Sequence, residues 1–368
     1  MSEVVRAALA TVVEGGTLSM EAARDAMGAV MDGDATPAQL AAFLVALRMR
    51  GETIDELAGF AAAMRDRVLR VEAPDGAVDV VGTGGDRSGT FNISTTAALV
   101  IAAAGVPVAK HGNRAITSRS GSADVLDALG VRIDHDAASA SRSIREIGFA
   151  FLFAPGFHPA MRHAGPTRRE IGIRTAFNLL GPLTNPAGTR RQLIGVGDPA
   201  AAARIARVAQ VLGTDRTLVV HGDGVDELPL DGTGVIHDVT PDGIEERRVS
   251  PRSLGLDEAS LADLSGGTPE ENAGLVEAIL GGADGARRDA VLLNAGAALV
   301  AAGRVVELRD GVAVASATIA SGRPLQLLGR LREERRAAEA AAASAEAVSA
   351  EAAAAEAAAR SPAPEAVR

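Results

Sequence analysis

The spacing of apolar residues predicts that the first 72 residues form only helices. Ala, Leu, Val, Phe and Met recur at helical spacing in this region. Ser19 and Thr36 stand where N-caps are expected, and Gly33 and Gly51 lie just past two helix ends. Nothing in this part suggests catalysis, so we interpret residues 1–72 as a small helical domain for packing or oligomerisation.

From residue 73 to about residue 332 the pattern changes to short β-branched runs that alternate with helical segments. The candidate strands are VDVV, VPVA, FAFLFA, RQLIGVG, LVVHG and VIHDVT. Such alternation is typical of an α/β domain with a mainly parallel central sheet flanked by helices. Residues 158–186 interrupt it with a polar helical stretch, which we expect to leave the sheet and rejoin the N-terminal helices.

The last segment, residues 333–368, is rich in Ala and Glu and has almost no large apolar side chains. Ala and Glu favour helix, but such a helix has little with which to dock. The sequence therefore predicts a solvated tail outside the fold and without a function.

A glycine-rich loop follows the strand candidate VDVV and precedes a helix that opens with Ser94 and Thr95. The loop reads Gly82, Thr83, Gly84, Gly85, Asp86. A strand, a glycine loop and a helix start together favour phosphate binding, because backbone N–H groups and the helix dipole face the anion. Asp86 would repel a phosphate unless a cation or ribose hydroxyls offset its charge.

Two further polar clusters are expected at the carboxyl ends of strands, facing the same crevice. The segment from Lys110 to Arg114 offers a point charge and a planar guanidinium for oxyanions, although it could also be a solvated loop. The pair Asp226 and Glu227 could be solvated surface, but it has the chemistry to hold Mg²⁺ together with a diphosphate.

The polar helical segment carries three arginines, Arg168, Arg169 and Arg174. They could form a charged helix face, or one of them could turn inward and bind an anionic second substrate. We interpret His158 and His163 as structural residues.

Composition narrows the classes of function. A formal net charge of −10 argues against a general nucleic-acid binder. The chain has no cysteine, which excludes disulfides and thiolate chemistry. The N-terminus does not resemble a signal peptide, and the apolar runs are shorter than the ~20 residues of a membrane span, so we expect a cytoplasmic protein without membrane contact.

Taken in order, several motifs resemble the anthranilate phosphoribosyltransferase family over about residues 1–330. They are GTGGD, NIST, KHGNR, GSADVLDALG, FHPAMRHAGPTRREIGIRTAFNLLGPLTNP and DGVDEL. The resemblance implies a helical domain hinged to an α/β domain, in a fold shared with pyrimidine nucleoside phosphorylases, and a homodimer formed through the helical domain. It also implies transfer of phosphoribose from 5-phosphoribosyl 1-diphosphate to the amine of anthranilate, with release of diphosphate and with Mg²⁺ as cofactor.

The same resemblance implies the roles of individual residues. Phosphoribosyl diphosphate would be bound by Gly82, Gly85, Asp86, Thr90, Asn92, Ile93, Ser94, Thr95, Lys110, His111, Gly112, Asn113, Arg114, Ala115, Ile116, Thr117, Ser118 and Ser122. Anthranilate would be contacted by Gly82, His111, Asn113 and Arg168, and Mg²⁺ by Ser94, Asp226 and Glu227. No residue is assigned as a catalytic acid or base. Ala115, Ile116 and Arg119 depart from the family's more usual Ser, Val and Lys.

Two alternatives stay open at this stage. A pyrimidine nucleoside phosphorylase would share the fold, but its phosphate loop would read more like Lys-x-Ser-Thr-Gly-Gly. A non-enzymatic, nucleic-acid-binding relative would have a basic groove and a degraded phosphate loop, whereas this loop is intact.

Overall fold

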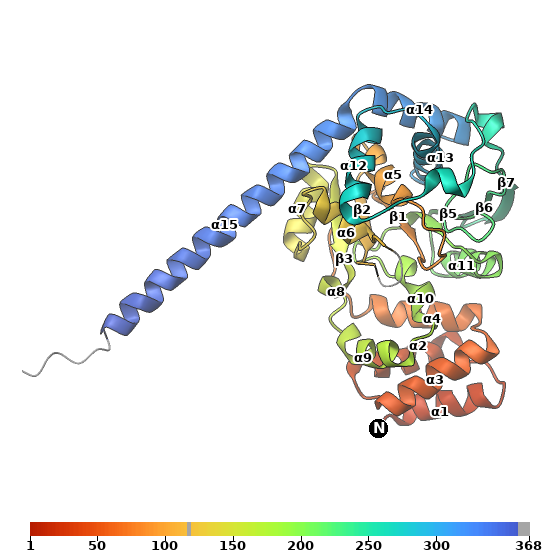
Figure 1. Cartoon of the computed structure of the whole chain (residues 1–368). Helices are drawn as coiled ribbons and strands as arrows, with labels where there is room; N and C mark the ends of the chain where they lie inside the picture. The colour runs from red at the N-terminus through yellow and green to blue at the C-terminus, as the bar shows by residue number, and fades with distance from the viewer. Residues whose placement is uncertain (116–118, 360–368) are drawn as a thin grey trace, which may run out of the picture.

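The computed structural model describes residues 1–115 and 119–359, with side chains up to residue 350. The chain begins with a bundle of four helices (Figure 1), which are α1 (Glu3–Val13), α2 (Met20–Asp32), α3 (Pro37–Arg50) and α4 (Ile54–Arg65). Both predicted N-caps are confirmed: the Ser19 hydroxyl accepts from the Ala22 amide, and Thr36 forms a capping box with Gln39. Gly33 and Gly51 have φ of 83° and 90° at the helix ends, as predicted.

The polar helical stretch after the third strand returns to this bundle. It contains α8 (Ala154–Phe157), α9 (Met161–Ile171), α10 (Phe177–Leu180) and the 3₁₀ turn η1 (Gly181–Leu183). Helix α9 packs against α2 and α3, and α10 packs against α4 (Figure 1). Segments distant in sequence therefore share one helical unit below the sheet.

The larger unit is built on a seven-stranded sheet with the order β3-β2-β1-β4-β5-β6-β7. Its strands are β1 (Val78–Gly82), β2 (Val108–Gly112), β3 (Phe149–Phe153), β4 (Arg191–Gly195), β5 (Arg216–His221), β6 (Val235–Thr240) and β7 (Gly243–Arg248). The first five strands run parallel, and β6 pairs antiparallel with both β5 and β7, which confirms the predicted mainly parallel sheet. Sequence patterning did not indicate β7, a polar edge strand with the sequence GIEERR.

Helices cover both faces of the sheet, and alternate strand residues enter different cores. The helices are α5 (Ile93–Ala103), α6 (Ser122–Ala128), α7 (Ala137–Glu146), α11 (Pro199–Val211), α12 (Pro269–Leu280), α13 (Ala286–Ala301) and α14 (Leu308–Ala320), with 3₁₀ turns η2 (Pro251–Leu254) and η3 (Leu261–Leu264). Leu193 and Leu218 pack with α5 and α13, whereas Ile194 and Val219 pack with α11 and the helical bundle. The bundle is thus joined to the sheet by an apolar core.

The C-terminal helix α15 (Arg323–Ala359) begins against the α/β domain and then projects away from it (Figure 1). Leu327, Leu328 and Leu331 are buried at its start. Beyond the predicted boundary at residue 332, the Glu334 carboxylate accepts from the Ser143 hydroxyl at 3.0 Å, and Arg335 contacts the end of α6. The boundary is therefore corrected: the docked part of α15 includes Arg335, because polar contacts continue after the leucines end. Within residues 1–115 and 119–359, no helix has the length and apolarity needed to cross a membrane.

Candidate active site

The glycine loop between β1 and α5 packs closely against a second loop and an arginine. A Cβ atom on Gly82 would collide with the Asp226 carboxylate, so this approach requires glycine. Gly85 has φ of 71°, and a Cβ there would collide with the guanidinium of Arg174. That guanidinium donates to the Gly84 carbonyl at 2.6 Å, which ties the loop to the polar helical stretch.

The acidic pair lies directly against this loop. The Gly84 amide donates to Asp226 Oδ2 at 2.7 Å, and the Asp226 amide donates to Asp86 Oδ2 at 3.2 Å. The Ser94 amide, in the first turn of α5, donates to Glu227 Oε1 at 3.1 Å. Asp86 therefore joins the two loops through backbone hydrogen bonds, a structural role besides any contact with ligand.

The carboxyl groups of Asp226 and Glu227 lie in an environment that disfavours their charge. Both residues stay partly accessible from the crevice, but their carboxyl groups are enclosed by protein atoms. Burial, followed by the nearby negative charge of Asp86, raises the pKa of Asp226. Burial, followed by the charge of Asp226, raises the pKa of Glu227 well above its ordinary value. A cation would relieve both effects.

These carboxylates fit a Mg²⁺ ion shared with a ligand. Among the described residues no Lys or Arg forms an ion pair with Asp226 or Glu227. Nor does that part of the chain hold a group of three or more His, Asp or Glu side chains suited to a metal. Mg²⁺ commonly takes one or two carboxylates and completes its sphere with water and phosphate oxygens. The donor set therefore matches a metal that arrives with a diphosphate.

Lys110 is the central residue of β2 and is 1% exposed. Its ammonium donates to the Val80 carbonyl of the neighbouring strand. Burial lowers the pKa of Lys110, and the negative charges of Asp79 and Glu227 oppose that shift. The ammonium group therefore lies within electrostatic reach of Asp79 and of Glu227 in the acidic pair.

His111, the next residue, is held as a neutral imidazole. Burial, followed by the proximity of His158, lowers the pKa of His111 to about 3. Its Nδ1 lies 3.1 Å from the Gly181 carbonyl, which can only accept, so Nδ1 carries the proton. The Nε2 atom is buried without a partner among the described residues and can accept a hydrogen bond.

A cavity of about 500 Å³ lies between the helical unit and the sheet, next to this histidine. Its lining includes Met64, Val81, Gly82, His111, Asn113, Pro155, His158, Arg168, Phe177 and Pro182. The Arg168 guanidinium lies 4.7 Å from the Phe177 ring centroid, and burial lowers the pKa of Arg168. One half-buried cation in a largely apolar cavity suits a flat anion.

The other predicted phosphoribosyl-diphosphate residues surround the same crevice, and their contacts differ. The Ser88 and Thr90 hydroxyls lie 3.2 Å apart, and the Asn92 side chain donates to the Ser120 carbonyl. The buried Thr95 hydroxyl has no partner among the described residues, and Ile93 packs in the hydrophobic core. Gly112 ends β2 beside Ser122. The Arg114 guanidinium is paired with Asp124 and Asp127, and Ala115 donates to Asp124. The predicted contacts of Ile116, Thr117 and Ser118 lie outside the described residues.

Sequence reasoning missed several residues that shape the site. Asp79 accepts from the His111 amide at 3.1 Å and from the Asn185 side chain at 2.8 Å, and burial raises its pKa to about 6. His158, interpreted as structural, lines the cavity with its ring centroid 5.1 Å from that of His111. No local pattern links Asp79, Asn185 and His158, which are distant in sequence and meet through tertiary packing.

Comparison with known proteins agrees with this geometry. Residues 6–68 match the helical bundle domain, and residues 74–325 the a/b domain, of a glycosyl transferase family. The anthranilate phosphoribosyltransferase of Mesorhizobium japonicum is 52% identical over 325 residues, which are 88% of this chain and 97% of the relative. The chain belongs to the anthranilate phosphoribosyltransferase family.

Solved structures of the family have the same fold. The anthranilate phosphoribosyltransferase of Thermus thermophilus superimposes with a TM-score of 0.85 at 46% identity, covering 89% of this chain and 99% of that one. The enzyme of Saccharomyces cerevisiae in complex with PRPP and Mg has a TM-score of 0.82 at 27% identity, covering 91% of this chain and 99% of that one.

Proposed function

We propose that this chain transfers the 5-phosphoribosyl group of 5-phosphoribosyl 1-diphosphate to the amine of anthranilate, giving N-(5-phosphoribosyl)anthranilate and diphosphate in tryptophan biosynthesis. The observation that carries the proposal is the contact between two unlike half-sites. A glycine loop with two enclosed carboxylates meets a largely apolar cavity in which Arg168 is half-buried and Arg162 and Arg169 are exposed, and Gly82 borders both. Membership of the family supports the same reaction.

Each half-site has a defined task in this reaction. The Ser94 hydroxyl and the positive charge of Lys110 are suited to the phosphate oxygens, and Ser94, Asp226 and Glu227 to Mg²⁺. The Gly84 and Ser94 amides orient the two carboxylates. When bound, Mg²⁺ neutralises negative charge on the diphosphate leaving group. Arg168 is suited to the anthranilate carboxylate, since a guanidinium can donate two parallel hydrogen bonds to it.

The chain's own residues can orient the amine. The Nε2 atom of His111 can accept a hydrogen bond from the anthranilate amine and turn its nitrogen lone pair toward the sugar. With a pKa of about 3, His111 is a weak proton acceptor, so we assign no general base. The aryl amine is neutral at pH 7 and needs none: its nitrogen bonds to C1 as the C1–O bond to diphosphate breaks, and the surplus proton then leaves.

The experiment that tests the proposal follows anthranilate fluorescence with purified protein. We expect fluorescence loss only when phosphoribosyl diphosphate and Mg²⁺ are both present, with diphosphate formed in equal amount. No loss under these conditions, or phosphorolysis of thymidine by the same sample, would reject it.

We further propose a cytoplasmic homodimer that pairs through the helical bundle. Helices α1 and α3 carry exposed apolar side chains: Val4 is 47% exposed, Val13 68% and Met49 83%. Light scattering should give twice the chain mass, and Met49→Glu should shift the sample toward monomer. A wild-type protein that is monomeric at micromolar concentration would contradict the proposed homodimer.

A further inference from the structure

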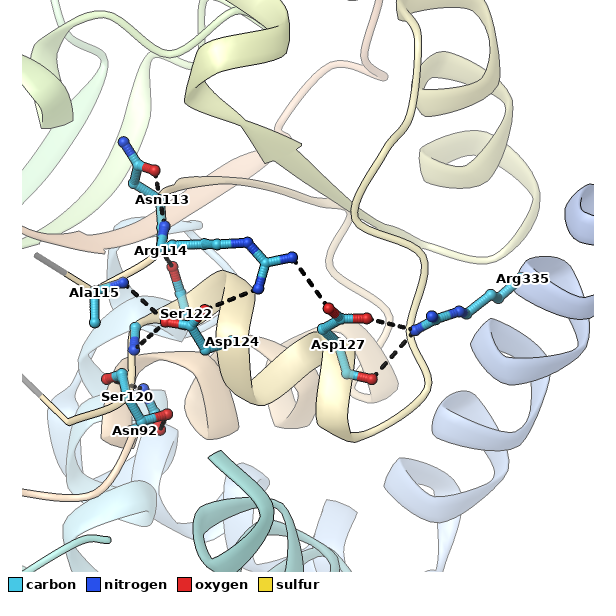
Figure 2. A network of polar contacts seen from close by, with 10 residues as sticks. Asn92, Asn113, Arg114, Ala115, Ser120, Ser122, Asp124, Asp127 and Arg335 are labelled. Atoms are coloured by element: carbon cyan, nitrogen blue, oxygen red, sulfur yellow. Dashed lines mark hydrogen bonds and ion pairs between the residues drawn. The ribbon is translucent and has the colours of Figure 1, made fainter. Parts of the chain in front are cut away.

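The docked part of α15 reaches the helix that supports the phosphoribosyl-diphosphate loop. Arg335 Nη1 donates to the Asp127 carbonyl at 3.2 Å and to Asp127 Oδ1 at 2.9 Å (Figure 2). It also lies 3.4 Å from the Val131 carbonyl. One arginine thus fixes both the C-terminal end of α6 and the orientation of the Asp127 side chain.

The second oxygen of Asp127 is used by an arginine of the predicted substrate loop. Arg114 Nη2 donates to Asp127 Oδ2 at 3.1 Å, and its Nη1 donates to Asp124 Oδ1 at 2.9 Å (Figure 2). Partial burial alone would raise the pKa of Asp127, but the hydrogen bonds from Arg114 and Arg335 lower it. Asp127 therefore stays charged between two guanidinium groups.

Asp124 continues the network into the backbone on both sides of the loop. Its Oδ2 accepts from the Ala115 amide at 2.8 Å and from the Gly121 amide at 2.9 Å. The Asn113 carbonyl accepts from the Ala123 amide at 3.2 Å and from the Ser122 hydroxyl at 3.3 Å. The loop residues predicted to bind substrate are consequently held on α6, the helix that Arg335 contacts from behind.

We propose that Arg335 is a positioning residue for phosphoribosyl diphosphate: through Asp127 it sets the place of Arg114 and of the backbone that follows His111. The inference rests on the function proposed above and names a residue from the tail that sequence patterning left outside the fold. Without Arg335, Asp127 is free to change rotamer, and Arg114 loses one of its two carboxylate partners.

The expected effect is moderate, since the side chains of Arg335 and Asp127 are 31% and 33% exposed. Partly solvated ion pairs contribute little singly, so Arg335→Ala should weaken phosphoribosyl-diphosphate binding by about two- to fivefold. The anthranilate KM should rise less than the Kd of phosphoribosyl diphosphate, and kcat should stay at the wild-type value, because Arg168 and His111 lie outside this network and Asn113 takes part through its backbone carbonyl.

Two arginines on the same helix supply matched controls. Arg332 anchors α15 through the Leu129 carbonyl and Glu277, without contact to Asp127. Arg336 is exposed, and among the described residues it donates only to the Arg332 carbonyl of its own helix. Arg332→Ala should lower the melting temperature at least as much as Arg335→Ala and leave substrate binding unchanged, and Arg336→Ala should change neither.

The test uses the full chain and measures the Kd of phosphoribosyl diphosphate with Mg²⁺ by calorimetry, alongside both KM values. The inference predicts a higher Kd for Arg335→Ala, partial recovery in Arg335→Lys, and no further change when Arg335→Ala is added to Asp127→Asn. A wild-type Kd in Arg335→Ala, or an equal increase in Arg332→Ala, would overturn it. If Arg335→Ala does not fold, Arg335→Lys decides by the same criteria.

This design separates the inference from the proposed function. A wild-type protein that binds phosphoribosyl diphosphate but consumes no anthranilate would reject the transferase activity and leave the role of Arg335 measurable. An active wild type with an unaffected Arg335→Ala variant would reject only the positioning role.

Discussion

The two half-sites treat buried ionisable groups in opposite ways. On the phosphate side, Asp226 and Glu227 keep carboxyl groups enclosed without an ion-pair partner among the described residues, so their pKa values rise. On the cavity side, His111 and His158 lose their charge, with pKa values of about 3 and 4, mainly because of burial. The phosphate side therefore favours binding of a cation that arrives with the ligand, and the cavity side favours binding of a neutral amine.

The difference explains how one crevice can hold two unlike substrates. Charge that is unbalanced in the free protein becomes balanced when Mg²⁺ and diphosphate bind, whereas a charged histidine beside the cavity would repel Arg168.

Removing both carboxylates should have the largest effect. The double variant Asp226→Asn with Glu227→Gln keeps the side-chain volumes but removes the oxygen charge that Mg²⁺ requires. We expect kcat to fall by about 100-fold or more, with a higher Mg²⁺ concentration for half-maximal rate. Steady-state rates across a Mg²⁺ titration measure both.

The control is Asp223→Asn, an exposed aspartate in the same loop, which should behave like wild type. An unchanged Mg²⁺ dependence in the double variant would show that the metal binds elsewhere.

Removing the charge of the half-buried Arg168 should raise the KM for anthranilate and leave the KM for phosphoribosyl diphosphate unchanged. Arg168→Met keeps the packing against Phe177 but deletes the charge, so the anthranilate KM should rise by about 10- to 100-fold, as for the loss of a charge-assisted hydrogen bond. Arg168→Lys should lie between the two. Initial rates with each substrate varied in turn provide the values. Equal increases in both KM values would place Arg168 outside the anthranilate half.

The low pKa of His158 should make the free energy of unfolding depend on pH in the acid range. In the unfolded chain His158 takes up a proton below about pH 6.5, but in the folded chain only near pH 4, so the unfolded state binds more protons between these values. Stability should therefore fall with decreasing pH, and His158→Gln should remove about 1.4 kcal/mol per pH unit from that slope. Urea unfolding at several pH values measures it.

The matched control is His163→Gln, which replaces an exposed histidine outside the cavity lining. A slope that is identical in wild type and His158→Gln would mean that His158 is accessible and titrates normally when folded.

Much of the fold was predictable because its signals are local. Helical spacing and caps predicted the N-terminal helices, and β-branched runs predicted the first six strands. Strand β7 was not predicted, because its polar residues are typical of a solvated edge strand and lack the apolar pattern of a buried one. The docking of α15 beyond residue 332 was not predicted, because Arg335 docks through polar contacts, which a pattern of apolar residues does not indicate.

The candidate site was predictable to the extent that its residues lie in motifs. The glycine loop, Lys110, Arg168 and the acidic pair were named from the sequence, and the structure brings them to one crevice. Asp79 and Asn185 were not named, since they meet across 106 positions of the chain. Contacts of that kind depend on tertiary packing and leave no local sequence signal.

The most direct test of the two-half account is a crystal structure of this chain with phosphoribosyl diphosphate, Mg²⁺ and a fluorinated, less reactive anthranilate. The account predicts the diphosphate and metal beside Asp226 and Glu227, and the aromatic ring in the 500 Å³ cavity with its carboxylate on Arg168. Ring density on the phosphate side, or a metal remote from the acidic pair, would contradict it.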